Sequence, residues 1–272
     1  MNRIFAFFCL LLLLSALTSG CKTKFEKLRA SGDVDLIYNK AFEYYDKKDY
    51  YEAQVLFEQI RGNLRGKNEL EKVMFSYAYS HYHLDNFLLS SYYFKQFANT
   101  FVNSSMREEA EFMSAYSNYR MSPSYRLDQS STEKAIEGLQ NFINSYPLSN
   151  RVQECNELID KCRSKLEEKA FAEGKLYYDL KQYQAATQSF DNLLKDYPET
   201  KNDEKVRFII VKANYELAVN SIVDKQEERF KMALDRCKVF ELKYPKSKDK
   251  KDVAAIRKEI EKKLKTINGH QN

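Results

Sequence analysis

The sequence contains few of the residues that interrupt regular structure: seven glycines and four prolines in 272 residues. No Asn-Gly or Asp-Gly pair stands between alternating strands, so signals for β-hairpins are almost absent. A content of 43% apolar and 31% charged residues is typical of globular proteins and excludes a chain that is disordered throughout. These absences favour helices, in one large domain or two ordinary ones.

Sequence motifs for catalysis are also missing. There is no G-x-S-x-G elbow, no Walker loop and no G-x-G-x-x-G run. The three histidines, His81, His83 and His270, and the dispersed cysteines are not spaced to build a metal cluster. We expect His81 and His83 to be partly exposed on a helix. The sequence therefore predicts that the protein is not an enzyme and has no catalytic residues, no metal site and no cofactor.

Residues 1–20 have the architecture of a secretory signal peptide. A short basic start precedes an apolar run of 11 residues, 4–14, which is too short for a stable membrane anchor. The small residues Thr18, Ser19 and Gly20 directly before Cys21 resemble a bacterial lipobox, although Thr18 stands where Leu is most usual. The resemblance implies that Cys21 becomes the first residue of the mature chain and carries the lipid. A plain signal peptide with an incidental cysteine is the alternative.

The residue after Cys21 bears on the location of the mature chain. Lys22 stands where an Asp would resemble an inner-membrane retention signal, so the lipobox implies a lipid anchor on the periplasmic face of the outer membrane. In that compartment we predict no nucleic-acid partner. Beyond Cys21 only Cys155, Cys162 and Cys237 remain, an odd number without a paired framework, and we expect them to be small buried residues.

A tyrosine–proline pair close to a Ser or Thr occurs three times in the chain. It reads "YPLS" from Tyr146, "YPET" from Tyr197 and "YPKS" from Tyr244. Proline just beyond an apolar helical run ends the helix. We therefore expect the tyrosine to pack at the end of a helix, the proline to stop that helix, and the Ser or Thr to cap the next one.

The segment 170–198 resembles a tetratricopeptide repeat, with Gly174 on a first helix and Ala186 and Phe190 on a second. Small residues at such positions let two helices approach closely. Other pairs of small residues mark four more units: Ala41 and Ala53, Ala78 and Ser90, Ala115 and Ala135, Ala213 and Ala233. In each of the last two pairs, eight additional residues separate the two small residues, and we expect them to form a longer loop between the helices.

These units predict an all-α fold, a tetratricopeptide-like α-solenoid of about five helix pairs in one curved array. We expect one long helix from about Arg151 to Lys181. After Lys246, a last helix with an apolar stripe at Val253, Ile256, Ile260, Leu264 and Ile267 would cap the end. We predict a signal peptide at residues 1–20 and a lipidated linker at 21–33. Repeats 1–3 follow at 34–148, the long helix with repeats 4–5 at 149–246, and a basic helix and tail at 247–272.

Together, the lipobox, the helix pairs and the Tyr-Pro endings resemble the family of the outer-membrane assembly lipoprotein BamD. The most specific likeness covers residues 121–200, with a Tyr-Arg-x-Asp-Gln loop, the two YP turns and the charged helix between them. The first unit departs from the pattern, having "IRGNLRGK" where the others close with YP.

The resemblance implies a non-enzymatic scaffold of the machinery that folds β-barrel proteins into the outer membrane. Its implied partners are the periplasmic domains of a BamA-like barrel subunit and unfolded outer-membrane proteins, whose C-terminal aromatic signal it would receive. The membrane itself would be contacted through the N-terminal lipid. The alternative function is a lipid-anchored repeat protein of another envelope system, such as cell-wall or division coordination.

Aromatic residues recur at three fixed positions on the first helix of the first three units. They are Tyr38, Phe42 and Tyr45, then Phe75, Tyr79 and Tyr82, then Phe112, Tyr116 and Tyr119. We interpret these nine residues as a candidate groove for an extended peptide with aromatic side chains. Packing between adjacent first helices is the alternative.

The basic residues are concentrated near the C-terminus. Residues 246–265 contain nine basic and four acidic residues. A basic helix there could meet anionic headgroups or an acidic partner, and the alternative is a solvated face.

Overall fold

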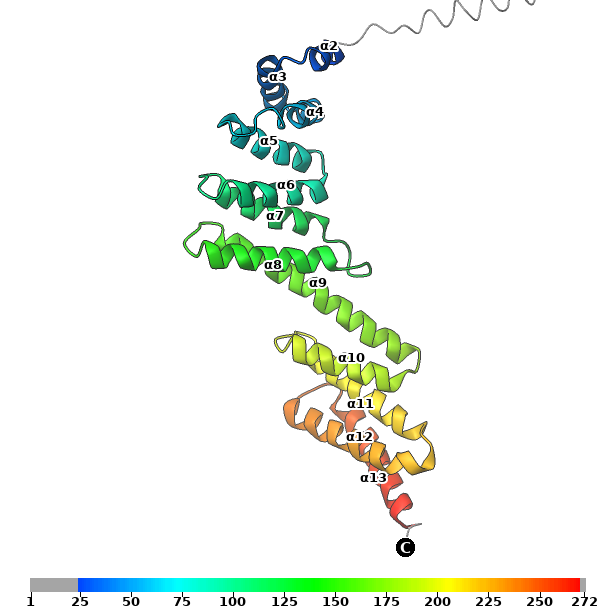
Figure 1. Cartoon of the computed structure of the whole chain (residues 1–272). Coiled ribbons are helices and arrows are strands. Elements are labelled where there is room, and N and C mark those ends of the chain that lie inside the picture. The colour runs from blue at the N-terminus through cyan, green and yellow to red at the C-terminus, as the bar shows by residue number, and fades with distance from the viewer. Residues whose placement is uncertain (1–23, 270–272) are drawn as a thin grey trace, which may run out of the picture. The chain divides into compact units, whose positions relative to one another are not determined.

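The computed structural model describes residues 24–269, in which twelve α-helices, α2 to α13, and no strand are present (Figure 1). The predicted all-α class is therefore confirmed. The described residues divide into two compact units. Unit 1 extends to Met121 and includes Glu137–Ser149, and unit 2 comprises Ser122–Ile136 and the residues from Asn150 onward. Over residues 24–269, no helix combines the length and the apolar character that crossing a membrane requires.

Unit 1 is built from consecutive antiparallel helix pairs. α3 (Val34–Asp46) packs on α4 (Tyr50–Ile60), and α5 (Glu69–His83) packs on α6 (Phe87–Thr100). α6 also contacts α7 (Arg107–Met121), which begins the third pair. Before these pairs, α2 (Lys24–Ala30) makes part of the expected linker helical.

Unit 2 begins with the loop before α8 (Ser130–Ser145), a helix whose second half is assigned to unit 1. It continues with α9 (Val152–Asp179), which confirms the predicted long helix, and α10 (Tyr183–Asp196). α11 (Asp203–Val219), α12 (Val223–Lys243) and α13 (Lys250–Gly269) complete it.

The eight additional residues of the third repeat form a loop, whereas those of the fifth repeat lengthen its helices. Between α7 and α8 they form the expected loop, which contains Pro123. In the fifth repeat the expected long loop is wrong, because only three residues separate α11 from α12. That segment has neither Gly nor Pro, so nothing stops the chain from remaining helical and the extra residues lengthen the helices instead.

Each Tyr-Pro segment forms the same tight turn, in which the N–H of the Ser or Thr donates to the tyrosine carbonyl three residues earlier. The donor–acceptor distances are 3.0 Å for Ser149, 3.1 Å for Thr200 and 3.1 Å for Ser247. Ser104 makes the same bond to Phe101 at 3.0 Å, a fourth copy that lacks both Tyr and Pro.

The hydroxyls of Thr200 and Ser247 do not cap the next helix as expected. The Oγ1 of Thr200 accepts the N–H of Asn202 at 3.1 Å, and the Oγ of Ser247 accepts the N–H of Asp249 at 3.0 Å. The following helices begin one residue later, at Asp203 and Lys250. Because the hydroxyl bonds only two residues ahead, it stabilises the turn before the helix rather than the first helical turn itself.

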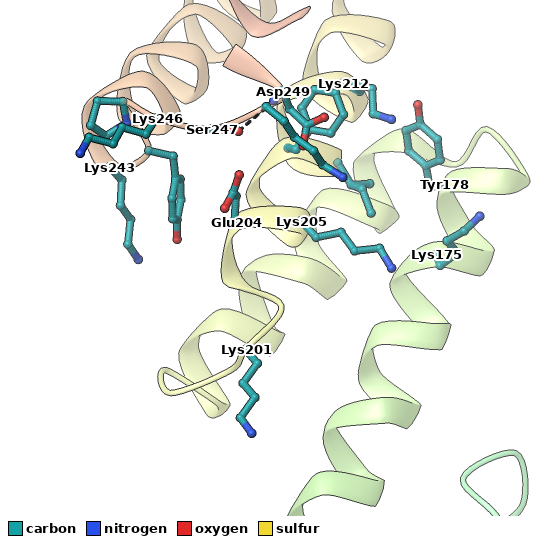
Figure 2. Close-up of a pocket in the computed structure, with 15 residues that line it drawn as sticks. Lys175, Tyr178, Lys201, Glu204, Lys205, Lys212, Lys243, Lys246, Ser247 and Asp249 are labelled. Carbon is teal, nitrogen blue, oxygen red and sulfur yellow. Dashed lines mark hydrogen bonds between the residues drawn. The ribbon is translucent and has the colours of Figure 1, made fainter. Parts of the chain in front are cut away.

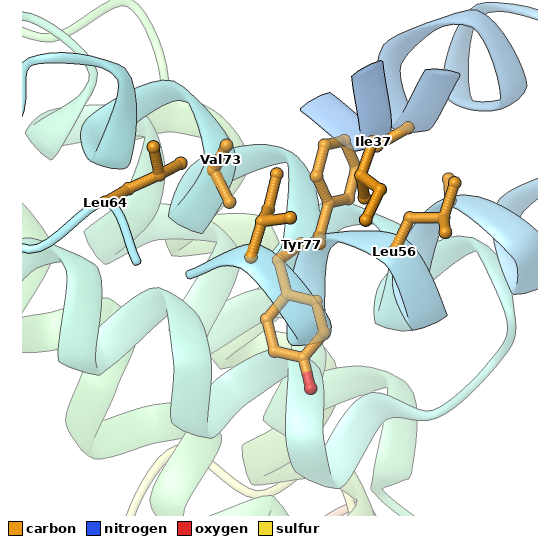
Figure 3. Close-up of a cluster of buried hydrophobic side chains, with 9 residues drawn as sticks. Ile37, Leu56, Leu64, Val73 and Tyr77 are labelled. Atoms are coloured by element: carbon orange, nitrogen blue, oxygen red, sulfur yellow. The ribbon is translucent and has the colours of Figure 1, made fainter. Parts of the chain in front are cut away.

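The small residues lie where two helices approach closely, as predicted. Ala41 and Ala53 are fully buried between α3 and α4. A Cβ added to Gly174 on α9 would lie 2.8 Å from the Phe190 ring of α10, closer than side chains pack. Around such contacts large residues fill the core, as Figure 3 shows for Ile37, Leu56 and Tyr77.

The C-terminal helix buries the apolar stripe that the sequence predicts. Val253 and Ile260 are fully buried in a cluster with Phe230 and Phe240, and Ile256, Leu264 and Ile267 pack at its edge. Cys155, Cys162 and Cys237 are free and buried, which confirms their expected role as small core residues. Burial raises the pKa of Cys237 to about 12, so its thiol stays protonated.

Candidate interaction surfaces

The predicted lipidation site, Cys21, and the predicted signal peptide lie outside the described residues. They stay predictions. The structure bears instead on the candidate groove of unit 1 and reveals a basic pocket in unit 2.

The nine predicted groove residues lie on α3, α5 and α7, three to each helix. Eight are half-buried, whereas Phe112 is only 2% exposed and packs on Phe142 with ring centroids 5.7 Å apart. Phe112 therefore has no ring surface to offer a ligand. From here the eight half-buried residues are called the aromatic surface: Tyr38, Phe42, Tyr45, Phe75, Tyr79, Tyr82, Tyr116 and Tyr119.

Within a repeat, the aromatic surface rests on the rings of the second helix. Phe42 lies 4.9 Å from Phe57 of α4, and Tyr79 lies 4.8 Å from Phe94 of α6, both edge to face. Such contacts place one side of each ring in the core. Burial, with smaller contributions from Tyr50 and Asp46, raises the pKa of Tyr45 to about 12, so the phenol remains a neutral hydrogen-bond donor.

Between repeats, residues of neighbouring first helices touch one another. The hydroxyl of Tyr79 donates to Oε1 of Glu109 at 2.5 Å, and the Tyr82 and Tyr116 rings lie 6.2 Å apart. Arg120 of α7 donates from Nη1 to the Tyr82 hydroxyl at 2.9 Å. Packing between first helices is thus present, yet it leaves the eight residues only half-buried.

Unit 2 contains a pocket of about 940 Å³ that the sequence did not predict (Figure 2). Its walls come from the end of α9, from one face of α11 and from the turn between α12 and α13. Seven lysines and two acidic residues, Glu204 and Asp249, line it, together with the rings of Tyr178, Phe208 and Tyr244. We call it the lysine pocket.

The sequence indicates part of this pocket when equivalent positions of the repeats are compared. Relative to Gly174, the fourth repeat carries Lys175 and Tyr178 at two of the positions that hold the aromatic residues in the first three repeats. Both of these side chains line the pocket. The other walls depend on the packing of α11 and of the α12–α13 turn, which sequence spacing does not reveal.

The histidines differ from the expectation. His81 is buried, 3% exposed, and stacks on Tyr93 with ring centroids 5.2 Å apart, so the predicted partial exposure is wrong for it. It lies on the face of α5 that packs against α6, and burial lowers its pKa. His83 is exposed and stacks on Tyr50 at 4.2 Å. Within residues 24–269 no cluster of His, Cys, Asp or Glu is arranged to hold a metal ion.

The family model for YfiO, an outer membrane lipoprotein, matches residues 31–230, which include α3 to α11 and the start of α12. This chain belongs to the YfiO family. The resemblance to BamD-like outer-membrane lipoproteins is thereby confirmed. The family is one of outer-membrane lipoproteins, which supports a location in the cell envelope, and its members are generally non-enzymatic scaffolds. The family match ends before the turn that closes the lysine pocket.

Among solved structures, one that this YfiO-family chain resembles contains TPR-like repeats of a kinesin light chain from Podosopora anserina. The identity is 12% and the TM-score 0.33, over 79% of this chain and 97% of the other. The search of curated proteins found no match.

Proposed function

We propose that the protein is a non-enzymatic periplasmic scaffold of the outer-membrane β-barrel assembly machinery, held at the membrane by a lipid on Cys21. The observation that carries the proposal is the family match over residues 31–230, which spans most of the described helix pairs. Stacked helix pairs suit this role because they present long surfaces to extended partners.

We propose the aromatic surface of unit 1 as the site for unfolded outer-membrane proteins with an aromatic C-terminal residue. Its support is the exposure of eight rings, six of them tyrosines, along three consecutive first helices. Tyrosine suits such a surface because its ring packs on apolar groups while its hydroxyl bonds to the polar edges of a peptide.

The last two repeats, from α9 to α12, are the proposed docking site for the periplasmic domains of a BamA-like barrel subunit. The resemblance to the BamD family implies the partner, and the lysine pocket supports the choice of surface because it is a pocket of ligand size.

The decisive experiment is extraction of the full-length lipoprotein in mild detergent, followed by identification of the proteins that co-purify. A β-barrel protein with several periplasmic domains is the expected partner. Recovery of cell-wall or division proteins in its place would contradict the proposal and favour the alternative envelope function. An unlipidated variant, Cys21→Ala, serves as control for association through the membrane alone.

A further inference from the structure

The lysine pocket concentrates positive charge, and ion pairs within residues 24–269 compensate only part of it. Lys243 pairs with Asp203 at 2.6 Å, and Lys175 pairs with Asp179 at 2.7 Å. The other pocket lysines make no ion pair with any residue of the described chain: Lys201, Lys205, Lys212, Lys246 and Lys248. Their like charges lie around one hollow, and an anionic ligand would reduce the repulsion between them.

One aromatic ring lies between two lysines along α11. Lys205, Phe208 and Lys212 are spaced by three and four residues and share one helix face. The Nζ atom of Lys212 lies 4.5 Å from the Phe208 centroid and 5.6 Å from that of Tyr178 on α9. Figure 2 shows Lys205 extending from α11 toward the side of the pocket formed by Lys175 and Tyr178.

This combination of groups selects for a particular ligand chemistry. A bare phosphate would engage the ammonium groups but leave the rings of Tyr178, Phe208 and Tyr244 without a partner. A peptide that carries carboxylates beside an aromatic or apolar side chain would engage both. The volume of about 940 Å³ lies near the upper end of the range for ligand pockets and suits a short run of residues.

We infer that the lysine pocket binds an acidic, aromatic-containing segment of a protein partner. The inference goes beyond the proposed function, because it names a ligand chemistry for this pocket that holds whichever protein supplies the segment. The segment lies against α11, with its carboxylates at Lys205 and Lys212 and its ring near Phe208. The carboxylates of Glu204 and Asp249 favour a few well-placed acidic groups over a long acidic run.

The test uses the full chain without its signal peptide and a fluorescein-labelled decapeptide in which Asp and Glu residues flank one Phe. We expect saturable binding that weakens as salt rises. The double variant Lys205→Glu/Lys212→Glu should reduce the affinity about ten-fold or more. Lys205→Gln/Lys212→Gln, which removes charge without reversing it, should give an intermediate loss.

Matched controls distinguish binding at the lysine pocket from nonspecific attraction between opposite charges. Lys262→Glu/Lys263→Glu makes the same change of charge at exposed positions of α13 outside the pocket, and should bind like the parent protein. A decapeptide with Asn and Gln in place of Asp and Glu should bind at least about ten-fold more weakly. Circular dichroism melts of all variants establish that each is folded.

The inference is overturned if both Glu double variants bind the acidic peptide equally, or if acidic and neutral peptides bind alike. It is also overturned if vesicles with phosphatidylglycerol bind through Lys205 and Lys212 while the peptide does not. Co-purification of the barrel subunit is scored separately. Loss of peptide binding with the barrel subunit retained would support the pocket and move the proposed docking site elsewhere.

Discussion

Arg236 of α12 and Asp191 of α10 form a two-pronged ion pair between the fourth and fifth repeats. Nη1 lies 3.0 Å from Oδ1 and Nη2 lies 2.6 Å from Oδ2, with about a third of each side chain exposed. The planar guanidinium matches both carboxylate oxygens at once, which a lysine ammonium does not. Because the two helices are 45 residues apart along the chain at this contact, the pair joins neighbouring repeats.

The first prediction is that Arg236→Lys destabilises the protein although the charge is kept. We expect a loss of about 1 kcal/mol in the free energy of unfolding, since partial exposure weakens the pair. Urea unfolding of the parent and variant measures it. Arg29→Lys, at the exposed pair with Glu26 on α2, is the control and should change little. Equal stability of the Arg236 variant and the parent would show that the paired geometry contributes nothing.

The second prediction concerns membrane attachment. Cys21→Ala should leave the protein soluble or uncleaved, because we expect the lipid to attach to this sulfur. Detergent phase partitioning and the mass of the mature chain are the measurements. Normal partitioning of the variant would rule out Cys21 as the lipid site.

The third prediction concerns peptide binding by the aromatic surface. Tyr45→Ala or Tyr79→Ala should weaken binding of a peptide with a C-terminal aromatic residue by about 1–3 kcal/mol, roughly 5- to 150-fold. Fluorescence anisotropy of the folded protein measures it, and the melting temperature should fall moderately because one side of each ring packs in the core. Tyr92→Ala, an exposed ring on α6 outside the surface, should bind normally.

Two results would count against this assignment. One is a large fall in stability with normal binding by the folded fraction, which would make the rings core residues. The other is equal binding of a peptide that lacks its terminal aromatic residue, which would remove the specificity.

The fourth prediction is that acid destabilises unit 1 through His81. Both ring nitrogens are buried and have no hydrogen-bond partner within residues 24–269, and burial holds the pKa below its ordinary value of 6.5. The carboxylate of Glu58 opposes this shift, and the nearby Arg61 adds to it. Because the unfolded state binds the proton more readily, stability is complete above about pH 6.5 and falls as pH drops toward the lowered pKa.

We expect at most about 1.4 kcal/mol of lost stability per pH unit from this one group. Urea midpoints measured across this pH range for the parent and for His81→Phe test it, since the variant should lose this part of the pH dependence. His83→Phe is the comparison at an exposed histidine. An unchanged pH dependence in His81→Phe would place its origin in other groups.

The fifth prediction concerns the docking of the barrel subunit. Deleting the chain from Lys201 onward removes α11 to α13 and should abolish co-purification with the barrel subunit. The helix pairs of unit 1 should remain folded, because the cluster around Ile37, Leu56 and Tyr77 draws only on residues before the deletion. Limited proteolysis and circular dichroism monitor that unit. Undiminished co-purification would place the interface elsewhere.

How much of each candidate surface the sequence predicts depends on whether the residues concerned are close together along the chain. The register of the aromatic residues on α3, α5 and α7 is local, so spacing identified the three positions per repeat. It could not separate Phe112 from its half-buried counterparts Tyr38 and Phe75, because the exposure of a ring depends on what packs over it. For Phe112 that neighbour includes Phe142, which lies 30 residues further along the chain.

By itself the sequence determined most of the helices, their pairing and the long α9, because helical periodicity, small crossing residues and Tyr-Pro turns act over a few residues. It also sufficed to indicate the family. Tertiary structure alone decided that His81 is buried and that Lys175, Lys205 and Lys246 line one pocket. These side chains come from α9, from α11 and from the turn after α12, so their proximity depends on how the helices pack, which no local pattern encodes.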